Sequence, residues 1–144
     1  MTKPIDTTPD RIIAALNLQP HPEGGWYRQT WAGPVLHGRA SGTAILFLLK
    51  ADQVSHWHRV DADEIWLWHA GAPLTLAMGL TMAQDIRLGP DVLAGDVPQV
   101  VVPADWWQSA KTTGSYSLVS CTVSPGFRFE GFELAAPEFD LARG

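Results

Sequence analysis

The feature that most restricts the fold of this chain is a series of short apolar runs, each closed by glycine or proline. The runs lie at residues 25–31, 43–49, 54–59, 64–69, 74–80, 84–88, 99–102, 107–111 and 116–123. Breakers such as Gly71-Ala72-Pro73 and Gly89-Pro90 separate them. Short runs with regular turn residues between them are typical of β-sandwiches and barrels. The sequence therefore predicts an all-β fold, without the strand–helix alternation of a parallel sheet.

A helix is expected only near the N-terminus. Thr8-Pro9-Asp10 supplies an N-cap residue, a proline in the first turn and an early acidic residue. The helix should end before Pro20, because the residue before a proline is pushed out of the α region. A length of 144 residues fits one domain. We expect that domain to comprise an N-terminal segment over residues 1–19, a barrel over 20–134 and a tail over 135–144.

Composition excludes several classes of function. The net charge is −5 and there is no basic run, so nucleic-acid binding through the phosphate backbone is not expected. The sequence shows neither a signal-peptide pattern nor an apolar stretch of membrane-spanning length, which predicts a cytoplasmic protein with no membrane partner. Cys121 is the only cysteine, so no internal disulfide framework is possible, and we expect a buried thiol.

The segment around His56-Trp57-His58 carries the most chemical information. Residues two apart on a strand point to the same face, so His56 and His58 are predicted to project together. Glu64 follows after a short turn and is expected to join them. Two imidazoles and a carboxylate can form a metal site with open positions, or a proton-transfer site that needs no metal. The residues alone leave both alternatives open.

The spacing of this segment is similar to the first motif of the cupin superfamily, His-x-His, a short gap, Glu, six residues and Gly. Here the gap before Glu64 has five residues, about one more than usual, and Gly71 closes the motif. The second cupin motif, Pro-x-Gly-x-x-His, is matched in spacing from Pro103, with Asp105 in place of glycine and Gln108 in place of histidine. The resemblance implies one divalent transition metal or none. The implied ligands are His56, His58, Glu64 and Gln108.

A longer set of blocks narrows the resemblance. They lie at residues 21–28, 57–61, 63–66, 71–74, 101–103, 107–108 and 121–127. On these blocks the chain is identified as a member of cupin subfamily 5, a domain of unknown function, from about Leu18 to Leu134. Membership implies a double-stranded β-helix (jelly-roll) fold, a homodimer and an unassigned reaction. In that subfamily the position of His56 varies, while the position of His58 commonly holds histidine.

Residues 21–31 are also loosely similar to the opening segment of the sugar-nucleotide 3,5-epimerases. Those enzymes are metal-free cupins that use a histidine base and a tyrosine acid. The likeness implies that His58 acts as base, Tyr27 as acid and Arg28 as an anchor for an anionic group. Because neighbouring residues on a strand alternate, only one of Tyr27 and Arg28 is expected to face inward.

Seven tryptophans in so short a chain suggest an aromatic-lined cavity. Trp66 and Trp68 share the parity of Glu64, so both are predicted to line the cavity, whereas alternation puts Trp57 on the face opposite His58. The predicted substrate-binding set is Arg28, Trp57, Trp66, Trp68 and Gln108.

Three functions remain open. The first is a metal-independent isomerase or epimerase for a sugar-like or other small metabolite, with His58, Glu64 and Tyr27 as catalytic residues. The second is a metal-dependent enzyme such as a dioxygenase. The third is a non-catalytic module that binds a small molecule.

Overall fold

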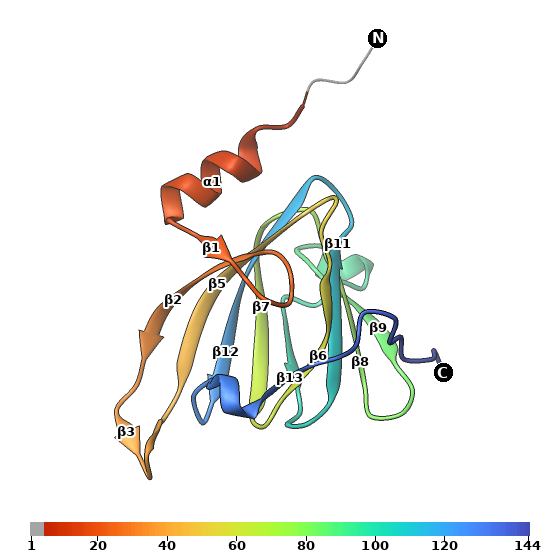
Figure 1. Cartoon of the computed structure of the whole chain (residues 1–144). Coiled ribbons are helices and arrows are strands. Elements are labelled where there is room, and N and C mark those ends of the chain that lie inside the picture. The colour runs from red at the N-terminus through yellow and green to blue at the C-terminus, as the bar shows by residue number, and fades with distance from the viewer. Residues whose placement is uncertain (1–4) are drawn as a thin grey trace.

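Two antiparallel sheets face each other and enclose the interior of the molecule (Figure 1). The computed structural model describes residues 5–144. The first sheet runs β1 (Gln19–Pro20), β2 (Trp26–Ala32), β5 (Thr43–Lys50), β12 (Tyr116–Ser124), β7 (Asp63–Gly71) and β10 (Gln99–Val102). The second runs β13 (Phe132–Leu134), β6 (Ser55–Val60), β11 (Trp107–Thr112), β8 (Leu74–Gly79) and β9 (Gln84–Leu88).

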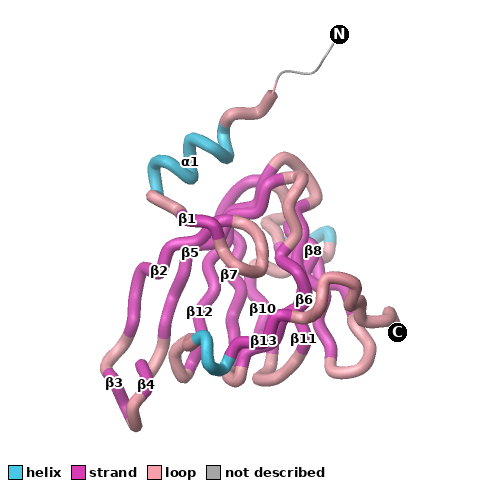
Figure 2. The backbone as a smooth tube through the Cα atoms, in the orientation of Figure 1, coloured by secondary structure: helices cyan, strands magenta, loops and turns pink. Residues whose placement is uncertain are grey.

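The remaining elements are short. A two-stranded hairpin of β3 (Val35–Leu36) and β4 (Arg39–Ala40) extends beyond the sheets, and two 3-10 turns are η1 (Val92–Ala94) and η2 (Phe129–Gly131) (Figure 2). Each apolar run in the sequence overlaps one of the strands, and neighbours such as β5 and β12 come from distant parts of the chain. The predicted all-β double-stranded β-helix is confirmed.

The one α-helix among the described residues, α1 (Thr8–Leu16), lies outside the sandwich at one end (Figure 2). It begins one residue after the N-cap Thr7 and carries Pro9 in its first turn, where a missing N–H costs nothing. It ends at Asn17 in the left-handed conformation, well before Pro20. An ion pair of 2.5 Å between Asp10 Oδ1 and Lys50 Nζ ties the helix to β5. Among residues 5–144, no helix combines the length and apolar character needed to cross a membrane.

The hydrophobic core fills one part of the space between the sheets and leaves a cavity in the other. On β5, the inward residues Thr43 and Ile45 face the cavity, while Phe47 and Leu49 lie in the core. The same change occurs on β7 between Glu64 and Trp66. Position along a strand, as well as the face of the sheet, therefore decides whether a side chain reaches the cavity.

Candidate functional site

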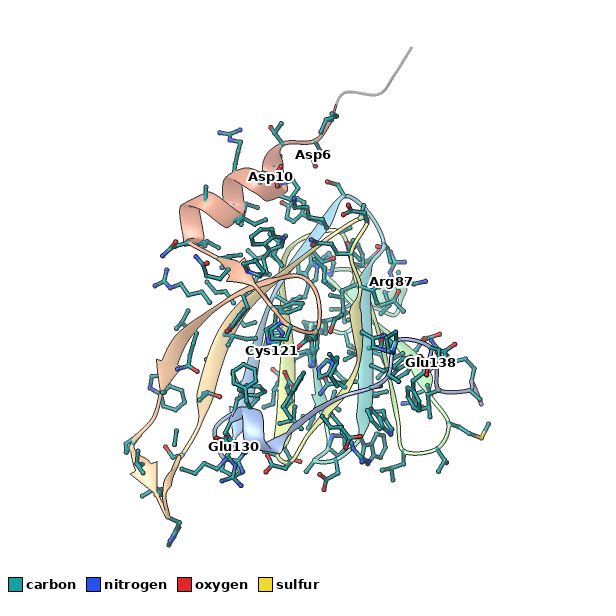
Figure 3. All side chains as sticks on the ribbon, in the orientation of Figure 1. Asp6, Asp10, Arg87, Cys121, Glu130 and Glu138 are labelled. Carbon is teal, nitrogen blue, oxygen red and sulfur yellow. The ribbon has the colours of Figure 1, made fainter. Side chains whose placement is uncertain are left out.

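The cavity has a volume of about 250 Å³ and combines a polar floor with an aromatic mouth. The floor contains His21, Glu23, His58, Glu64 and Cys121, and the aromatic wall contains Tyr27, Phe127, Phe129 and Phe132. Figure 3 shows Cys121 between the two sheets, away from the surface carboxylates that it also labels. A volume near the lower end of the usual range for ligand pockets suits a small molecule.

His58 enters the cavity because β6 contains an irregularity in its pairing. On β11, Gln108 pairs with His58 and Ala110 with Ser55, so three steps along β6 oppose two along β11. An extra residue of this kind is a β-bulge, and it breaks the alternation of side chains. Ser55 and His58 are both buried, whereas His56 lies in a separate groove beside Trp57. The prediction that His56 and His58 project together is therefore wrong.

The ring of His58 is held in one orientation by the main chain. Its Nδ1 lies 2.7 Å from the carbonyl oxygen of His56, and a carbonyl can only accept, so Nδ1–H donates. In the neutral imidazole this bond leaves the lone pair on Nε2. Nε2 faces the cavity floor and lies 3.4 Å from Glu23 Oε2. Burial lowers the pKa of His58, so its neutral form is favoured at neutral pH.

Glu23 reaches the floor from the tight turn that precedes β2. The turn is closed by Gly24 N–H donating to the carbonyl of His21 at 3.0 Å. The Ser55 hydroxyl donates to Glu23 Oε2, and His56 N–H donates to the Glu23 carbonyl at 2.8 Å. His21 Nδ1 accepts the backbone N–H of Glu23 at 3.1 Å and lies 3.3 Å from Oε1 of the same residue. These contacts fix the carboxyl beside His58.

The protonation states of the floor follow from burial. Burial raises the pKa of Glu23 to about 8 and outweighs the hydrogen bond from Ser55, so Glu23 keeps its proton at neutral pH. Burial also raises the pKa of Glu64 to about 7, against the attraction of His58. The pKa of His21 falls to about 4, first through burial and then through His58. Near neutrality the floor thus holds two neutral imidazoles, one protonated carboxyl and one carboxyl at its midpoint.

Glu64 is positioned by a chain of hydrogen bonds that runs into the core. The Trp66 indole N–H donates to Gln108 Oε1 at 2.7 Å, and Gln108 Nε2–H donates to Glu64 Oε1 at 2.9 Å. Gln108 and Trp66 are each 1% exposed. The indole has only a donor, so it fixes which end of the Gln108 amide faces Glu64. Gln108 thus orients a cavity residue from directly behind it.

Comparison with known proteins places this architecture in a family. The family described as Cupin superfamily (DUF985) matches residues 10–135, most of the chain. The chain belongs to this cupin family. The membership predicted from the sequence blocks is thereby confirmed.

Solved structures agree with this assignment. A protein from Shewanella oneidensis is 39% identical, with 88% of this chain and 84% of that one covered and a TM-score of 0.84. A hypothetical protein from Leishmania major is 32% identical, with coverage of 88% and 86% and a TM-score of 0.82. A dTDP sugar isomerase from Desulfovibrio desulfuricans, 18% identical over 80% of this chain and 83% of its own with a TM-score of 0.57, shares the fold alone. No curated protein matches the chain at a significant level.

The cupin motifs imply a metal, but the side chains do not form the predicted ligand set. His56 Nε2–H donates to the carbonyl of Ala136 at 2.8 Å, outside the cavity. The amide oxygen of Gln108 already accepts the Trp66 N–H. His58 and Glu64 remain, and within residues 5–144 no three His, Cys, Asp or Glu side chains are grouped to hold a metal ion. We therefore assign no chemistry here to a metal.

Several residues predicted to bind substrate lie outside the cavity of this cupin. Arg28 alternates with the inward Tyr27, is exposed, and donates to the carbonyl of Leu16 at 3.1 Å. Trp57 faces outward and donates to Asp140 at 3.0 Å. Trp66 and Trp68 have the predicted parity but pack in or against the core, one and two inward positions beyond Glu64. None of this predicted substrate-binding set lines the cavity, whereas the three predicted catalytic residues, His58, Glu64 and Tyr27, do.

Four of the cavity residues that sequence reasoning missed lie outside the strands. His21 and Glu23 lie in the turn before β2, and Phe127 and Phe129 lie on the segment that links β12 to β13. The sequence did contain a signal for two of them. His21 and Glu23 flank Pro22 within the first block that resembles the cupin subfamily. Loop residues held by a rigid sheet are where binding groups are commonly found.

We expect Gly24→Ala to destabilise this cupin by about 3 kcal/mol or more. Gly24 has φ +107, and a Cβ there would overlap the backbone carbonyl of Val54. Gly38→Ala is a matched control, because Gly38 also has positive φ (+78) but a Cβ would meet nothing within 4 Å. The control should lose only about 1–2 kcal/mol in urea unfolding. Equal losses would show that the turn is not packed against Val54.

Proposed function

We propose that this cupin binds a small molecule in the barrel and moves a proton between two of its atoms, as a metal-independent isomerase or epimerase does. The observation that carries the proposal is an acid beside a base. The Nε2 lone pair of His58 lies 3.4 Å from the carboxyl of Glu23, which burial keeps protonated. This separation exceeds the usual N–H···O distance of about 2.7–3.2 Å, so both groups are free to bond a ligand.

The reaction can be written with these two groups. His58 Nε2 takes a proton from a carbon next to a carbonyl, while Glu23 gives its proton to the carbonyl oxygen, forming an enediol. In isomerisation, His58 then returns a proton to the neighbouring carbon, and the hydroxyl on the first carbon gives its proton to the Glu23 carboxylate as it becomes the new carbonyl. In epimerisation, a proton returns to the other face of the first carbon, and the oxygen that Glu23 protonated gives that proton back to Glu23. The carboxylate of Glu64 stabilises the imidazolium that forms in between, since the two groups attract each other. Tyr27 lies in the same wall, where its hydroxyl can orient the ligand or donate a proton.

The test is proton exchange with solvent. Aldoses, ketoses and small hydroxy ketones are incubated with the protein in D₂O, and loss of the C–H signal next to the carbonyl is followed by ¹H NMR. We expect exchange with a compound that fits the cavity, and a loss of roughly 10²–10⁴-fold in His58→Gln, the usual contribution of one acid–base group. His56→Gln is the matched control and should retain exchange, because position 56 contributes only its backbone carbonyl to the site.

The rival functions give different results. Exchange that persists in His58→Gln would remove the proposed base. Ligand-dependent thermal stabilisation without any exchange would indicate a binding module. Stoichiometric transition metal in untagged protein, lost in His58→Gln, would replace the metal-independent mechanism with a metal-dependent one.

A further inference from the structure

The ionisable side chains that line the cavity are unequally divided between acidic and basic types. The wall contains two acidic side chains, Glu23 and Glu64, and within residues 5–144 no lysine or arginine lines it. Both carboxyls are nearly inaccessible, with exposed fractions of 8% and 6%. An anion brought into this space would meet buried acidic groups with no fixed cation to balance it.

Three arginines close to cavity-lining residues are engaged elsewhere. Arg39 donates to the Gly126 carbonyl at 2.6 Å and to Asp61 at 2.7 Å. Arg128 lies 3.4 Å from the same Asp61 carboxylate. Arg28 points to the helix carbonyl of Leu16. None of the three is available to the cavity without breaking an existing contact.

The mouth is apolar instead of cationic. Phe127 packs edge-on against Phe129 and Phe132, with ring centroids 5.0 and 5.7 Å apart. The Phe132 ring also lies 5.6 Å from the His58 ring, so the aromatic group extends down to the floor. A ligand must lose its hydration shell as it passes between these rings into the cavity. This loss costs a charged group far more than a neutral hydroxyl or carbonyl.

We propose that the cavity admits uncharged small molecules and excludes anions. Resting on the proton-transfer function proposed above, this names the substrate class as an uncharged hydroxy-carbonyl compound, not a phosphorylated or carboxylated one. The raised pKa values of Glu23 and Glu64 agree, since the floor itself favours its neutral forms. An anion next to these two carboxyls would either cause their further protonation or be repelled by a carboxylate a few ångströms away.

Cys121 offers a direct probe, because it is the only cysteine and lies in the cavity floor. Iodoacetamide and iodoacetate have nearly the same size and differ in charge. Each alkylates a thiolate at its methylene carbon and releases iodide, while the thiol proton goes to buffer. Rates at Cys121 in the folded protein are measured by mass spectrometry at pH 8 and divided by the rates with free cysteine. We expect the normalised rate of iodoacetamide to exceed that of iodoacetate by about tenfold or more.

A charge placed at the mouth provides the matched control. Gln29 lines the cavity and is exposed, so Gln29→Arg should raise the iodoacetate rate several-fold and leave iodoacetamide nearly unchanged. Thr30→Arg adds the same charge to the next residue of β2, which does not line the cavity, and should change neither rate. Equal effects of the two arginines would mean that net charge, and not the cavity, governs access.

The outcomes separate this inference from the proposed reaction. Equal normalised rates for the two reagents in the native protein would overturn anion exclusion and leave proton transfer by His58 untouched. Burial raises the pKa of the Cys121 thiol well above its usual value, so absence of labelling by both reagents would report on the thiol and not on access to the cavity. In that case the exchange rates of neutral and phosphorylated sugars decide the inference. Exchange activity in D₂O with phosphorylated sugars, at rates matching the neutral sugars, would overturn both anion exclusion and the substrate class and leave proton transfer in place.

Discussion

Replacing Trp66 with alanine is expected to lower the free energy of unfolding by about 3–5 kcal/mol. The indole is 1% exposed, and its ring meets Phe47 edge-on with centroids 6.0 Å apart. The substitution empties a large volume in the core and also leaves Gln108 Oε1 without its donor. Urea unfolding followed by far-UV circular dichroism measures the loss.

Trp31→Ala is the control for this prediction. Trp31 is on β2 in the same sheet but is 52% exposed, so its replacement should cost less than about 1 kcal/mol. Trp66→Phe keeps most of the volume and removes the indole donor, and it should lose roughly 1–3 kcal/mol. A Trp66→Ala loss no larger than that of Trp31→Ala would contradict the packing described here.

The free energy of unfolding is expected to fall as pH rises from about 6.5 to 8. Burial raises the pKa of Glu23 from 4.5 to about 8 and that of Glu64 from 4.5 to about 7, so the folded state holds these protons after the unfolded chain has lost them. Their stabilising effect is complete below pH 4.5 and disappears as pH passes through the folded values. The slope should reach up to about 1.4 kcal/mol per pH unit for each carboxyl.

His21 acts in the opposite direction, but in another pH range. Its pKa falls from 6.5 in the unfolded chain to about 4 in the folded state, so protonation of the unfolded chain below pH 6.5 lowers the free energy of unfolding. This loss is regained as the pH rises to 6.5. Above 6.5 the two carboxyls act without this opposition. Burial also lowers the pKa of His58 from 6.5, so two imidazoles oppose the two carboxyls below that pH. Chemical denaturation at half-unit pH steps should therefore show its steepest decline on the alkaline side of pH 6.5.

Glu23→Gln identifies the source of the slope. This variant should lose most of the decline between pH 7 and 8, because an amide does not titrate. Glu138→Gln removes an exposed carboxylate on the C-terminal tail, far from Cys121 in Figure 3, and should keep the full decline. A decline of the same size in Glu23→Gln would show that another group holds the proton.

The strands were predictable from sequence because alternation and turn residues act locally. The same rule predicted correctly that only one of Tyr27 and Arg28 faces inward, without saying which, but it failed for His56. The bulge in β6 depends on how β6 pairs with β11, a strand about fifty residues away, and no local pattern reports it. Alternation along β7 also predicted correctly that Trp66 faces the interior, but it did not determine whether Trp66 lies beside the cavity or in the core. That position depends on where the core ends, which the tertiary packing decides.

The cavity floor was only partly predictable for a related reason. His58 and Glu64 sit on strands whose period is visible in the sequence, whereas Glu23 sits in a turn. Its position beside His58 arises from contacts with Ser55 and the backbone of His56, which lie more than thirty residues away along the chain. The acid of the proposed pair therefore emerges only when the turn is folded against β6.

The bond from His58 to a main-chain carbonyl also bears on how the family can diversify. In catalytic triads the imidazole is oriented by a carboxylate side chain, which one mutation can delete. Here the acceptor is the backbone of residue 56, and every amino acid supplies the same oxygen. The backbone conformation of β6 thus determines which nitrogen of the His58 imidazole carries the proton. The side chain at position 56 can therefore change without moving that proton.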